Sequence, residues 1–468
     1  MKLVVANGTL YDPKNDVEGE VRDVGIEDGI IVSEVSDPDR VIDARGHIVM
    51  AGGIDIHAHV ATYGLNWGRY LFGFPTPREI GRTYARMGYT HVHEPFMTLV
   101  TAACVHHELS FIPIVDTSAS LVINPRDLET RLKSEDNRIP VERALSFLLF
   151  RARGLTIKLY EPYVVYDDEV YAFKNIEDQD ILSFFSAPGE RLLSRIFLHT
   201  YPALLDREVS APERFHFCHM GAVLDNDTRS EKAAALLERG ATGDMGLFGP
   251  EGRLKVALCR PDTREPHICL SLGFCRPLCV GRADDPKDGV AERSLRLALT
   301  HPMELAFSTD MPNHGGLQSY AAVFALLMNR ESRRLGGVTE TSGHEYSISD
   351  FVRVTRQIPA QILNLTQKGH LGPGAVGDVA VYDWRDGGKD LASCLGSCAY
   401  LIREGEVVVE RFEILREDVD KRLYYSGREE GEEGLAREIC RSTSLRFENL
   451  RVDEMFTGKT MHVAPSSV

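Results

Sequence analysis

Residues 53–60 read Gly-Ile-Asp-Ile-His-Ala-His-Val, and this octapeptide constrains the fold of the chain more than any other segment. Apolar residues alternate with Asp55, His57 and His59, which is the pattern of a β-strand and puts both histidines on one face. Two imidazoles at the end of a strand can bind one divalent metal ion. The alternative is a pair of histidines on a solvated strand face, and the choice depends on ligands elsewhere in the chain.

The composition is that of an ordinary globular protein. The chain has 468 residues, 43% of them hydrophobic and 26% charged, and a formal net charge of −16. Its length suits one large barrel with an accessory unit. The acidic balance argues against binding to nucleic acid or to an anionic membrane surface. Because we find neither a signal peptide nor an apolar run near the roughly 20 residues that span a bilayer, we expect a cytoplasmic protein.

The nine cysteines are scattered along the chain without a framework of regular spacings. An odd number of dispersed cysteines is typical of reduced thiols in the cytosol. Cys275 with Cys279, and Cys394 with Cys398, are separated by three residues rather than two. This spacing favours buried free thiols over an iron–sulfur or structural zinc site.

The pattern of predicted elements changes at residue 53. Before it, short strands and tight turns indicate a small β unit, beginning with Lys2–Ala6 and the hairpin signal Asn7-Gly8. After it, strands alternate with helices, which indicates a parallel sheet, and eight such strands fit a (β/α)8 barrel. The candidate strands are Ile54–Val60, Thr90–Glu94, Phe111–Asp116, Thr156–Tyr160, Arg195–His199, Phe215–His219, His267–Leu272 and Leu305–Asp310. The candidate helices include Pro77–Met87, Val141–Ala152, Asp178–Phe185, Arg229–Arg239 and Leu317–Arg330.

The expected fold class is therefore α/β: a (β/α)8 TIM-type barrel with a small β-sandwich built from N- and C-terminal segments. We expect the β-sandwich to comprise residues 1–52 and 366–412, and the barrel, a metal-dependent hydrolase domain, to comprise residues 53–365. Residues 413–468 read as a C-terminal extension that could contact another protein chain.

Barrel enzymes place their chemistry at the carboxyl ends of the strands. Each candidate there has an alternative: His199 and His219 could be core histidines, Asp310 could cap a helix, and His91 with His93 is better explained as a polar pair at the barrel mouth. Lys158 cannot bind a cation unless it first reacts with CO2 to form a carbamate. What favours a metal site is the joint order of these residues at successive strand ends. The residues are His57, His59, His91, His93, Lys158, His199, His219 and Asp310.

With these motifs, the chain resembles the amidohydrolase superfamily, in its two-metal form with a carboxylated lysine. Within that superfamily, stretches along nearly the whole chain are similar to the A subunit of formylmethanofuran dehydrogenase and of the bacterial formyltransferase/hydrolase complex. They include Gly52–His59, Ser308–Asn313, Glu345–Ser347 and Lys368–Ala375. Three loops depart from the family pattern, namely Lys158-Leu159-Tyr160, Leu198-His199-Thr200 and Asp310-Met311-Pro312. The departures keep the ligand residues and alter the segments expected to face the substrate.

The resemblance implies two divalent metal ions, expected to be zinc, and a CO2-derived carbamate that makes Lys158 an N6-carboxylysine. It implies that Asp310 is also the catalytic acid and base, and it suggests Asn313 and His314 for substrate binding. The implied metal ligands are His57, His59 and Asp310 for the first ion, His199 and His219 for the second, and Lys158 between them.

The implied reaction is hydrolysis, or the reverse condensation, of the formamide bond of an N-formyl aminomethylfuran cofactor such as formylmethanofuran or formylmethylofuran. Formate would be the product, and the partners would be formyltransferase or formate-generating subunits of a one-carbon transfer complex. Two other hypotheses remain open. One is a stand-alone binuclear amidohydrolase that acts on a cyclic amide or another small amide, and the other is a catalytically inactive scaffold subunit.

Overall fold

The structure is a computed structural model of the whole chain. The residues that it describes are 1–62, 65, 69, 74–124, 128, 135–160, 181–186, 193, 195–246, 254–258, 268–271, 277–282, 290–311, 317, 319–335, 344–443, 445–450, 452–453 and 457–464.

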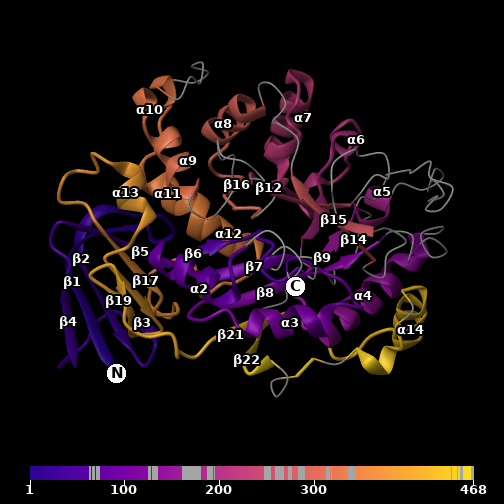
Figure 1. Cartoon of the computed structure of the whole chain (residues 1–468), viewed down its shortest axis with the longest axis horizontal. Coiled ribbons are helices and arrows are strands. Elements are labelled where there is room, and N and C mark those ends of the chain that lie inside the picture. The colour runs from indigo at the N-terminus through magenta and orange to yellow at the C-terminus, as the bar shows by residue number, and fades with distance from the viewer. Residues whose placement is uncertain are drawn as a thin grey trace.

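A curled parallel sheet lies at the centre of the molecule, with helices around it (Figure 1). Eight strands follow one another around this sheet in chain order, and every neighbouring pair is parallel. They are β6 (Gly53–Asp55), β7 (Tyr89–Met97), β8 (Asp116–Ile123), β9 (Thr156–Leu159), β10 (Ile196–His199), β11 (Phe215–Cys218), β12 (Thr242–Asp244) and β16 (Leu305–Ala306). The helices between and after them are α2 (Pro77–Arg86), α3 (Ala102–Ser110), α4 (Arg138–Ala152), α5 (Ile181–Ser186), α6 (Pro202–Leu205), α7 (Asp227–Glu238), α8 (Val290–Thr300) and α9 (Ser319–Met328). The arrangement confirms the predicted (β/α)8 barrel.

Backbone hydrogen bonds join the first and last strands just beyond their carboxyl ends. The amide of Asp310 donates to the carbonyl of His57 over 2.8 Å, and the amide of His59 donates to the carbonyl of Met311 over 2.9 Å. These residues belong to the segments that follow β6 and β16. The same contacts that close the barrel therefore fix the backbones of predicted ligand residues next to each other.

A second, mixed sheet of nine strands is built from both ends of the chain (Figure 1, indigo and orange). Its central strand β1 is parallel to β4 and β5 and antiparallel to β2, and β17 pairs with β5 to connect the two halves. Its own apolar core includes Leu3, Val49 and Val381. The domain boundaries predicted from the sequence remain a prediction. The strands are β1 (Lys2–Asp12), β2 (Val17–Glu27), β3 (Ile30–Val32), β4 (Arg40–Asp43), β5 (His47–Ala51), β17 (Val379–Asp383), β18 (Tyr400–Arg403), β19 (Glu406–Glu410) and β20 (Glu413–Ile414).

Beyond β20, the C-terminal segment packs on the barrel. Strand β21 (Arg422–Tyr425) pairs in parallel with β8, and β22 (Thr460–Val463) pairs with β21. Helix α14 (Glu433–Ser442) lies beside α4, where the rings of Phe147 and Phe447 are 5.8 Å apart (Figure 1). Contact of this segment with another protein chain remains a prediction.

The remaining described helices follow α9 and connect the barrel to the second sheet. A π-helical turn, Arg353–Gln357, continues α11 directly into α12. Together these three pieces extend from Ile348 to Ile362. The helices are α10 (Arg330–Leu335), α11 (Ile348–Val352), α12 (Ile358–Ile362) and α13 (Leu391–Gly396). Among the helices that the structure describes, none is both long and apolar enough to cross a membrane.

Local sequence explains the sharp boundaries of α2. Thr76 accepts a hydrogen bond from the amide of Glu79, the Glu79 carboxylate accepts one from the amide of Thr76, and Pro77 occupies the first turn. This reciprocal cap satisfies amides that have no partner inside the helix. At the other end, Gly88 has a φ of +80°, and a Cβ there would lie 2.2 Å from the Tyr382 hydroxyl. Only glycine fits this turn into β7.

Two of the predicted barrel strands are wrong. Strand β8 begins at Asp116, where the predicted strand Phe111–Asp116 ends. Strand β14 (Ile268–Ser271) overlaps the prediction His267–Leu272, but it lies in an antiparallel sheet with β15 (Pro277–Arg282) and β13 (Leu254–Leu258). The seventh barrel position belongs to β12. The predictions followed apolar runs, whereas β8 has polar side chains inside the barrel and β12 is only three residues long.

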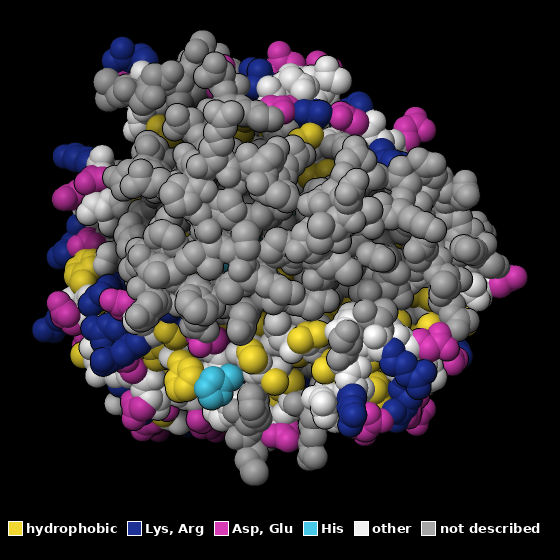
Figure 2. Space-filling view, turned by 45° about the vertical axis from the view of Figure 1, so that its right-hand side comes forward, with side chains coloured by type: hydrophobic (Ala, Val, Ile, Leu, Met, Phe, Trp, Pro, Cys, Tyr) yellow, Lys and Arg dark blue, Asp and Glu magenta, His cyan; other side chains and the backbone are white. Residues whose placement is uncertain are grey.

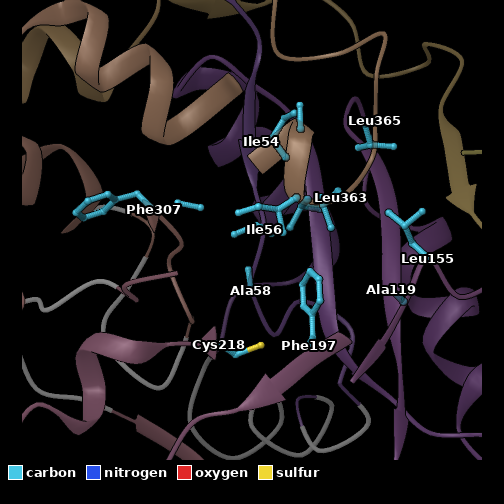
Figure 3. Close-up of a cluster of buried hydrophobic side chains, with 14 of the residues drawn as sticks. Ile54, Ile56, Ala58, Ala119, Leu155, Phe197, Cys218, Phe307, Leu363 and Leu365 are labelled. Carbon is cyan, nitrogen blue, oxygen red and sulfur yellow. The ribbon is translucent and has the colours of Figure 1, made fainter. Parts of the chain in front are cut away.

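One large apolar cluster fills the space between the barrel strands and their helices. Figure 3 shows members of this cluster from β6, β10 and β11, including Ile54, Phe197 and Cys218. All three are fully buried. This packing holds the strands rigidly, so that the residues at their carboxyl ends have fixed positions.

Candidate metal centre

The structure brings the six predicted ligand residues to the same end of the barrel. His57 and His59 follow β6, Lys158 lies in β9, and His199 ends β10. His219 follows β11, and Asp310 follows β16. Every one of them is buried except His199, which is partly buried. We call this set of residues, His57, His59, Lys158, His199, His219 and Asp310, the histidine cluster.

Three members of the cluster surround one point. The Asp310 Oδ1 atom lies 3.5 Å from His57 Nε2 and 3.4 Å from His59 Nε2. The ligand atoms of these residues all lie within 4.8 Å of one another. Two ligands bound at 2.0–2.1 Å to a tetrahedral zinc ion are about 3.3–3.4 Å apart. The spacing of these side chains therefore fits a zinc ion.

The electrostatic state of His57 suits metal binding. Its side chain is fully buried, and neither ring nitrogen has a hydrogen-bond partner among the described residues. Burial, followed by the nearby charge of Lys158, lowers the pKa of His57 to about 4. The imidazole is therefore neutral at pH 7, and neutral imidazole is the form that binds metals.

His199 and His219 form a second pair of facing imidazoles. His219 Nε2 lies 3.1 Å from His199 Nδ1, and the ring centroid of His219 lies 5.2 Å from that of His57. Burial is the main cause that holds the pKa of both residues well below the ordinary value of histidine. Two neutral imidazoles at this spacing can share a hydrogen bond or bind one cation.

Lys158 is buried beside these histidines and is only 1% exposed. Its charge contributes to the lowered pKa of His57, His199 and His219. Among the residues that the structure describes, no carboxylate forms an ion pair with it. An isolated ammonium group is expensive to bury. Conversion to an anionic carbamate would remove this charge and supply the oxygen ligands that two neighbouring cations need.

Glu94 is a site residue that the sequence analysis did not select. Its carboxylate accepts hydrogen bonds from the amides of Val60 (2.9 Å) and Ala61 (2.7 Å) and from the hydroxyl of Thr62 (2.6 Å). Because the Thr62 hydroxyl donates to Glu94, it accepts a hydrogen bond from His59 Nδ1 at 2.8 Å. His59 therefore keeps its proton on Nδ1 and directs the lone pair of Nε2 towards Asp310. A carboxylate at the end of a predicted strand was the signal that could have identified Glu94.

His91 and His93 lie inside the barrel rather than at its mouth. Both are fully buried in β7, and each accepts or donates a hydrogen bond with Ser118 at 2.8 Å. His93 also contacts Ser120 at 2.7 Å. These hydroxyls of β8 bind both ring nitrogens of His93 and the Nε2 atom of His91, so the prediction of a barrel-mouth pair is corrected to a polar interior pair.

Asp244 and Cys218 also lie against the cluster, and the sequence analysis selected neither of them. Both are fully buried, and the ligand atoms of His57, Cys218 and Asp244 lie within 4.8 Å of one another. Burial raises the pKa of the Cys218 thiol well above its ordinary value, so the thiolate form that binds metals is disfavoured. The predicted substrate-binding residues Asn313 and His314 lie outside the described residues.

The histidine cluster lies at the ends of the first, fourth, fifth, sixth and eighth barrel strands. The profile of the amidohydrolase family matches part of this chain, residues 265–409. The predicted resemblance to the amidohydrolase superfamily is confirmed.

Two curated proteins are similar to nearly the whole chain. Protein FwdA of Methanocaldococcus jannaschii is 25% identical, over 91% of this chain and 91% of its own length. The A subunit of the formyltransferase/hydrolase complex Fhc of Methylorubrum extorquens is 28% identical, over 88% of this chain and 89% of its own length.

Solved structures agree on the fold. The formyltransferase/hydrolase complex FhcABCD from Methylorubrum extorquens, crystallised with methylofuran, contains a chain that superposes with a TM-score of 0.82 at 23% identity, over 100% of both chains. A variant of triazine hydrolase superposes with a TM-score of 0.53 at 16% identity, over 94% of this chain and 99% of the other.

Proposed function

We propose that this chain is a metal-dependent amidohydrolase that acts on the formamide bond of an N-formyl aminomethylfuran cofactor, of the formylmethanofuran or formylmethylofuran type. The observation that carries the proposal is the similarity, from one end of the chain to the other, to FwdA and to the A subunit of the Fhc complex. The reaction adds water across the C–N bond and gives formate and a free amine. In the opposite direction, formate and the amine condense.

The residues of the histidine cluster would hold two divalent cations. The first ion would be bound by His57, His59 and Asp310. The second would be bound by His199 and His219, and the carbamate of Lys158 would bind both ions. When bound, such ions polarise a carbonyl and lower the pKa of a water molecule towards about 7. Zinc suits the imidazole and carboxylate donors present here.

Asp310 is placed to move the proton of the reaction. It is 1% exposed, and its backbone amide is fixed by the carbonyl of His57 at 2.8 Å. As a general base it would accept the proton of the attacking water, and as an acid it would return that proton to the nitrogen of the departing amine. The formyl carbon gains the C–O bond to water as the C–N bond breaks.

Aromatic side chains cover the cluster and keep bulk water away from it. The rings of Phe96 and Tyr160 are 5.4 Å apart, and the ring of Tyr160 lies 4.6 Å from that of His199. Phe96 is 5% exposed and Tyr160 is 9% exposed. A dry site strengthens the interactions of charged groups during the reaction.

The proposed physiological unit is a hetero-oligomer with formyltransferase or formate-generating subunits. Figure 2 shows Lys and Arg side chains interspersed with Asp and Glu along the described part of one face. On α2, the side chains of Arg78 and Arg82 pair with Glu417 and so do not form an open cationic groove. We place the contacts with these partners on the C-terminal segment, residues 413–468, of which β21, β22 and α14 pack on the outside of the barrel.

The test combines metal analysis, intact mass and activity on the gently purified full-length chain. We expect about two zinc ions per chain and a mass increment of one CO2 that disappears in Lys158→Ala. N-formyl furfurylamine and formylmethanofuran are the substrates to assay, with formate as the measured product. Wild type should release formate, and Lys158→Ala should lose at least about 100-fold in rate.

Lys459→Ala is the matched control, because Lys459 is another buried lysine, 4% exposed, which donates to the Thr117 hydroxyl rather than facing the histidines. This variant should retain the metal ions, the CO2 adduct and the activity. Folded wild-type protein without metal and without adduct would contradict the proposal and favour the scaffold hypothesis. Faster turnover on cyclic amides than on the formyl furans would favour the stand-alone hydrolase.

A further inference from the structure

Asp244, at the end of β12, is a buried carboxylate to which three elements of the site are tied. Its Oδ1 atom accepts hydrogen bonds from the amide of His219 at 3.0 Å and from the hydroxyl of Ser308 at 2.5 Å. Its Oδ2 atom accepts a hydrogen bond from His216 Nε2 at 3.0 Å. The side chain is 0% exposed, so every one of these contacts is made within the protein.

The remaining acceptor position of Asp244 faces His57. His57 Nδ1 lies 3.4 Å from Asp244 Oδ2, while His57 Nε2, on the other side of the ring, lies 3.5 Å from Asp310 Oδ1. An ionised carboxylate has about four lone-pair positions. Three hydrogen bonds and the approach of His57 Nδ1 together match this acceptor capacity.

We propose that Asp244 is a positioning residue: its charge keeps the proton of His57 on Nδ1, so that Nε2 offers its lone pair on the side of Asp310. The inference rests on the proposed function, in which His57 binds a metal through Nε2. Metal-binding histidines usually donate their other ring N–H to a carboxylate or carbonyl, which fixes both tautomer and ring orientation. Thr62 and Glu94 perform the same task for His59, so both imidazoles that follow β6 are oriented from outside the cluster.

Two substitutions separate a role in tautomer control from a role in packing. In Asp244→Asn the amide oxygen must remain where the His219 amide donates, because that backbone N–H cannot reverse. The amide NH2 then faces His57 and forces Nδ1 to accept, which moves the proton to Nε2, the atom that should bind the metal. Asp244→Ala is less conservative in shape, but it leaves room for a water molecule that can accept the proton of Nδ1.

The measurement is the affinity of the full-length protein for zinc in chelator competition, together with the visible absorption spectrum of the cobalt-substituted protein. We expect Asp244→Asn to weaken zinc binding by about 10- to 100-fold and to change the cobalt spectrum. Asp244→Ala should weaken binding less than Asp244→Asn, although it should lower the unfolding temperature more. If Asp244 only packed against its neighbours, the variant with the larger loss of unfolding temperature would also show the larger loss of zinc affinity.

Glu142→Gln is the matched control, because Glu142 is another fully buried carboxylate that pairs with Arg214 at 3.0 Å, outside the cluster. It should lose stability and keep its zinc affinity. The inference is overturned if Asp244→Asn binds zinc within about threefold of wild type, or if Asp244→Ala binds zinc more weakly than Asp244→Asn. A wild type that binds no zinc would refute the proposed function itself, which is a different result.

Discussion

The two ends of the barrel each contain a buried group of ionisable side chains. The two groups differ in how their charges and hydrogen bonds are balanced by the protein. At the amino end of β8, Asp116 and Asp378 alternate with Lys368 and Arg403. Lys368 Nζ lies 2.8 Å from Asp116 and 2.6 Å from Asp378, and Arg403 lies 2.7 Å and 2.9 Å from the same carboxylates. We call these four residues the basal network. Its two positive and two negative charges neutralise each other.

The histidine cluster at the other end has no such balance. His57 Nε2 has no hydrogen-bond partner among the described residues, His57 Nδ1 has only the approach of Asp244 at 3.4 Å, and Lys158 has no carboxylate partner there. Buried polar groups that are satisfied stabilise a fold, whereas buried groups left unsatisfied need an explanation in function. The basal network joins the barrel to the second sheet, and the histidine cluster is prepared for ligands that the protein itself does not supply.

The largest expected effect comes from breaking the basal network. Among the described residues, Arg403→Met would leave Asp116 and Asp378 with Lys368 as their only cationic ion-pair partner. The loss of one member of a buried charge group costs about 3–5 kcal/mol. Denaturation in urea should show this loss in the free energy of unfolding. Arg416→Met is the control, because Arg416 makes exposed ion pairs with Glu406 and Asp418 that should contribute at most about 1 kcal/mol.

The zinc affinity of folded Arg403→Met should remain that of wild type, since the basal network lies at the opposite end of the strands. A loss of zinc affinity as large as the loss of stability would show that the two ends of the barrel are coupled. The contrast between the basal network and the histidine cluster would then fail.

Acid should act on buried neutral histidines before it acts on the basal network. His106, 1% exposed, donates from Nε2 to the carbonyl of Ala152 at 2.8 Å, and burial lowers its pKa to about 4. The unfolded chain binds the proton near pH 6.5 and the folded chain only near pH 4, so stability is complete above pH 6.5 and falls as the pH drops towards 4. At about 1.36 kcal/mol per pH unit, the loss from His106 is about 3 kcal/mol.

His106→Gln, which retains a donor for Ala152, should remove this part of the pH dependence. The measurement is the free energy of unfolding of wild type and variant at several pH values between 7 and 4. In the same range the basal network should keep its charges, because Arg403 and Lys368 hold the pKa of Asp116 well below its ordinary value. Parallel curves for the two proteins would contradict the assignment of His106 as a neutral buried histidine.

The smallest expected effect is a change in the free energy of unfolding that has opposite signs in the two regions. Lys158→Met should raise the free energy of unfolding by roughly 1–2 kcal/mol in the presence of a chelator, because it removes a buried cation that has no carboxylate partner among the described residues. The same change at Lys368 should lower it, because Asp116 and Asp378 would lose a partner. Thermal unfolding of both variants with excess chelator is sufficient, and a loss of stability in Lys158→Met would show that Lys158 is paired in the native protein.

The sequence identified the residues that the structure gathers into the histidine cluster more accurately than it identified the strands that carry them. His57 and His59 were recognisable because further candidate ligands follow them at successive predicted strand ends. Strand β8 was placed too early, because its hydroxyl residues, such as Ser118 and Ser120, do not form an apolar run. Those hydroxyls face His91 and His93 inside the barrel, a requirement that only the neighbouring strand imposes.

Asp244 shows why part of the site could not be predicted. It follows Thr242-Gly243 in a strand of three residues, too short for any periodicity to indicate its position. A strongly apolar segment further along, around β14, was chosen in its place. Nothing in the local sequence distinguishes Asp244 from an aspartate in a turn, because its partners lie in β11, after β6 and after β16.

The sequence by itself determined the alternation of strands and helices and the types of side chain at the strand ends, because both depend on residues that are close together in the chain. The tertiary structure decided how these side chains are charged and oriented. Neutral imidazoles, the direction of the His59 lone pair and the contact of Asp244 with His57 all depend on burial and on partners from distant segments. Those partners meet only when backbone hydrogen bonds join the segment after β16 to the segment after β6.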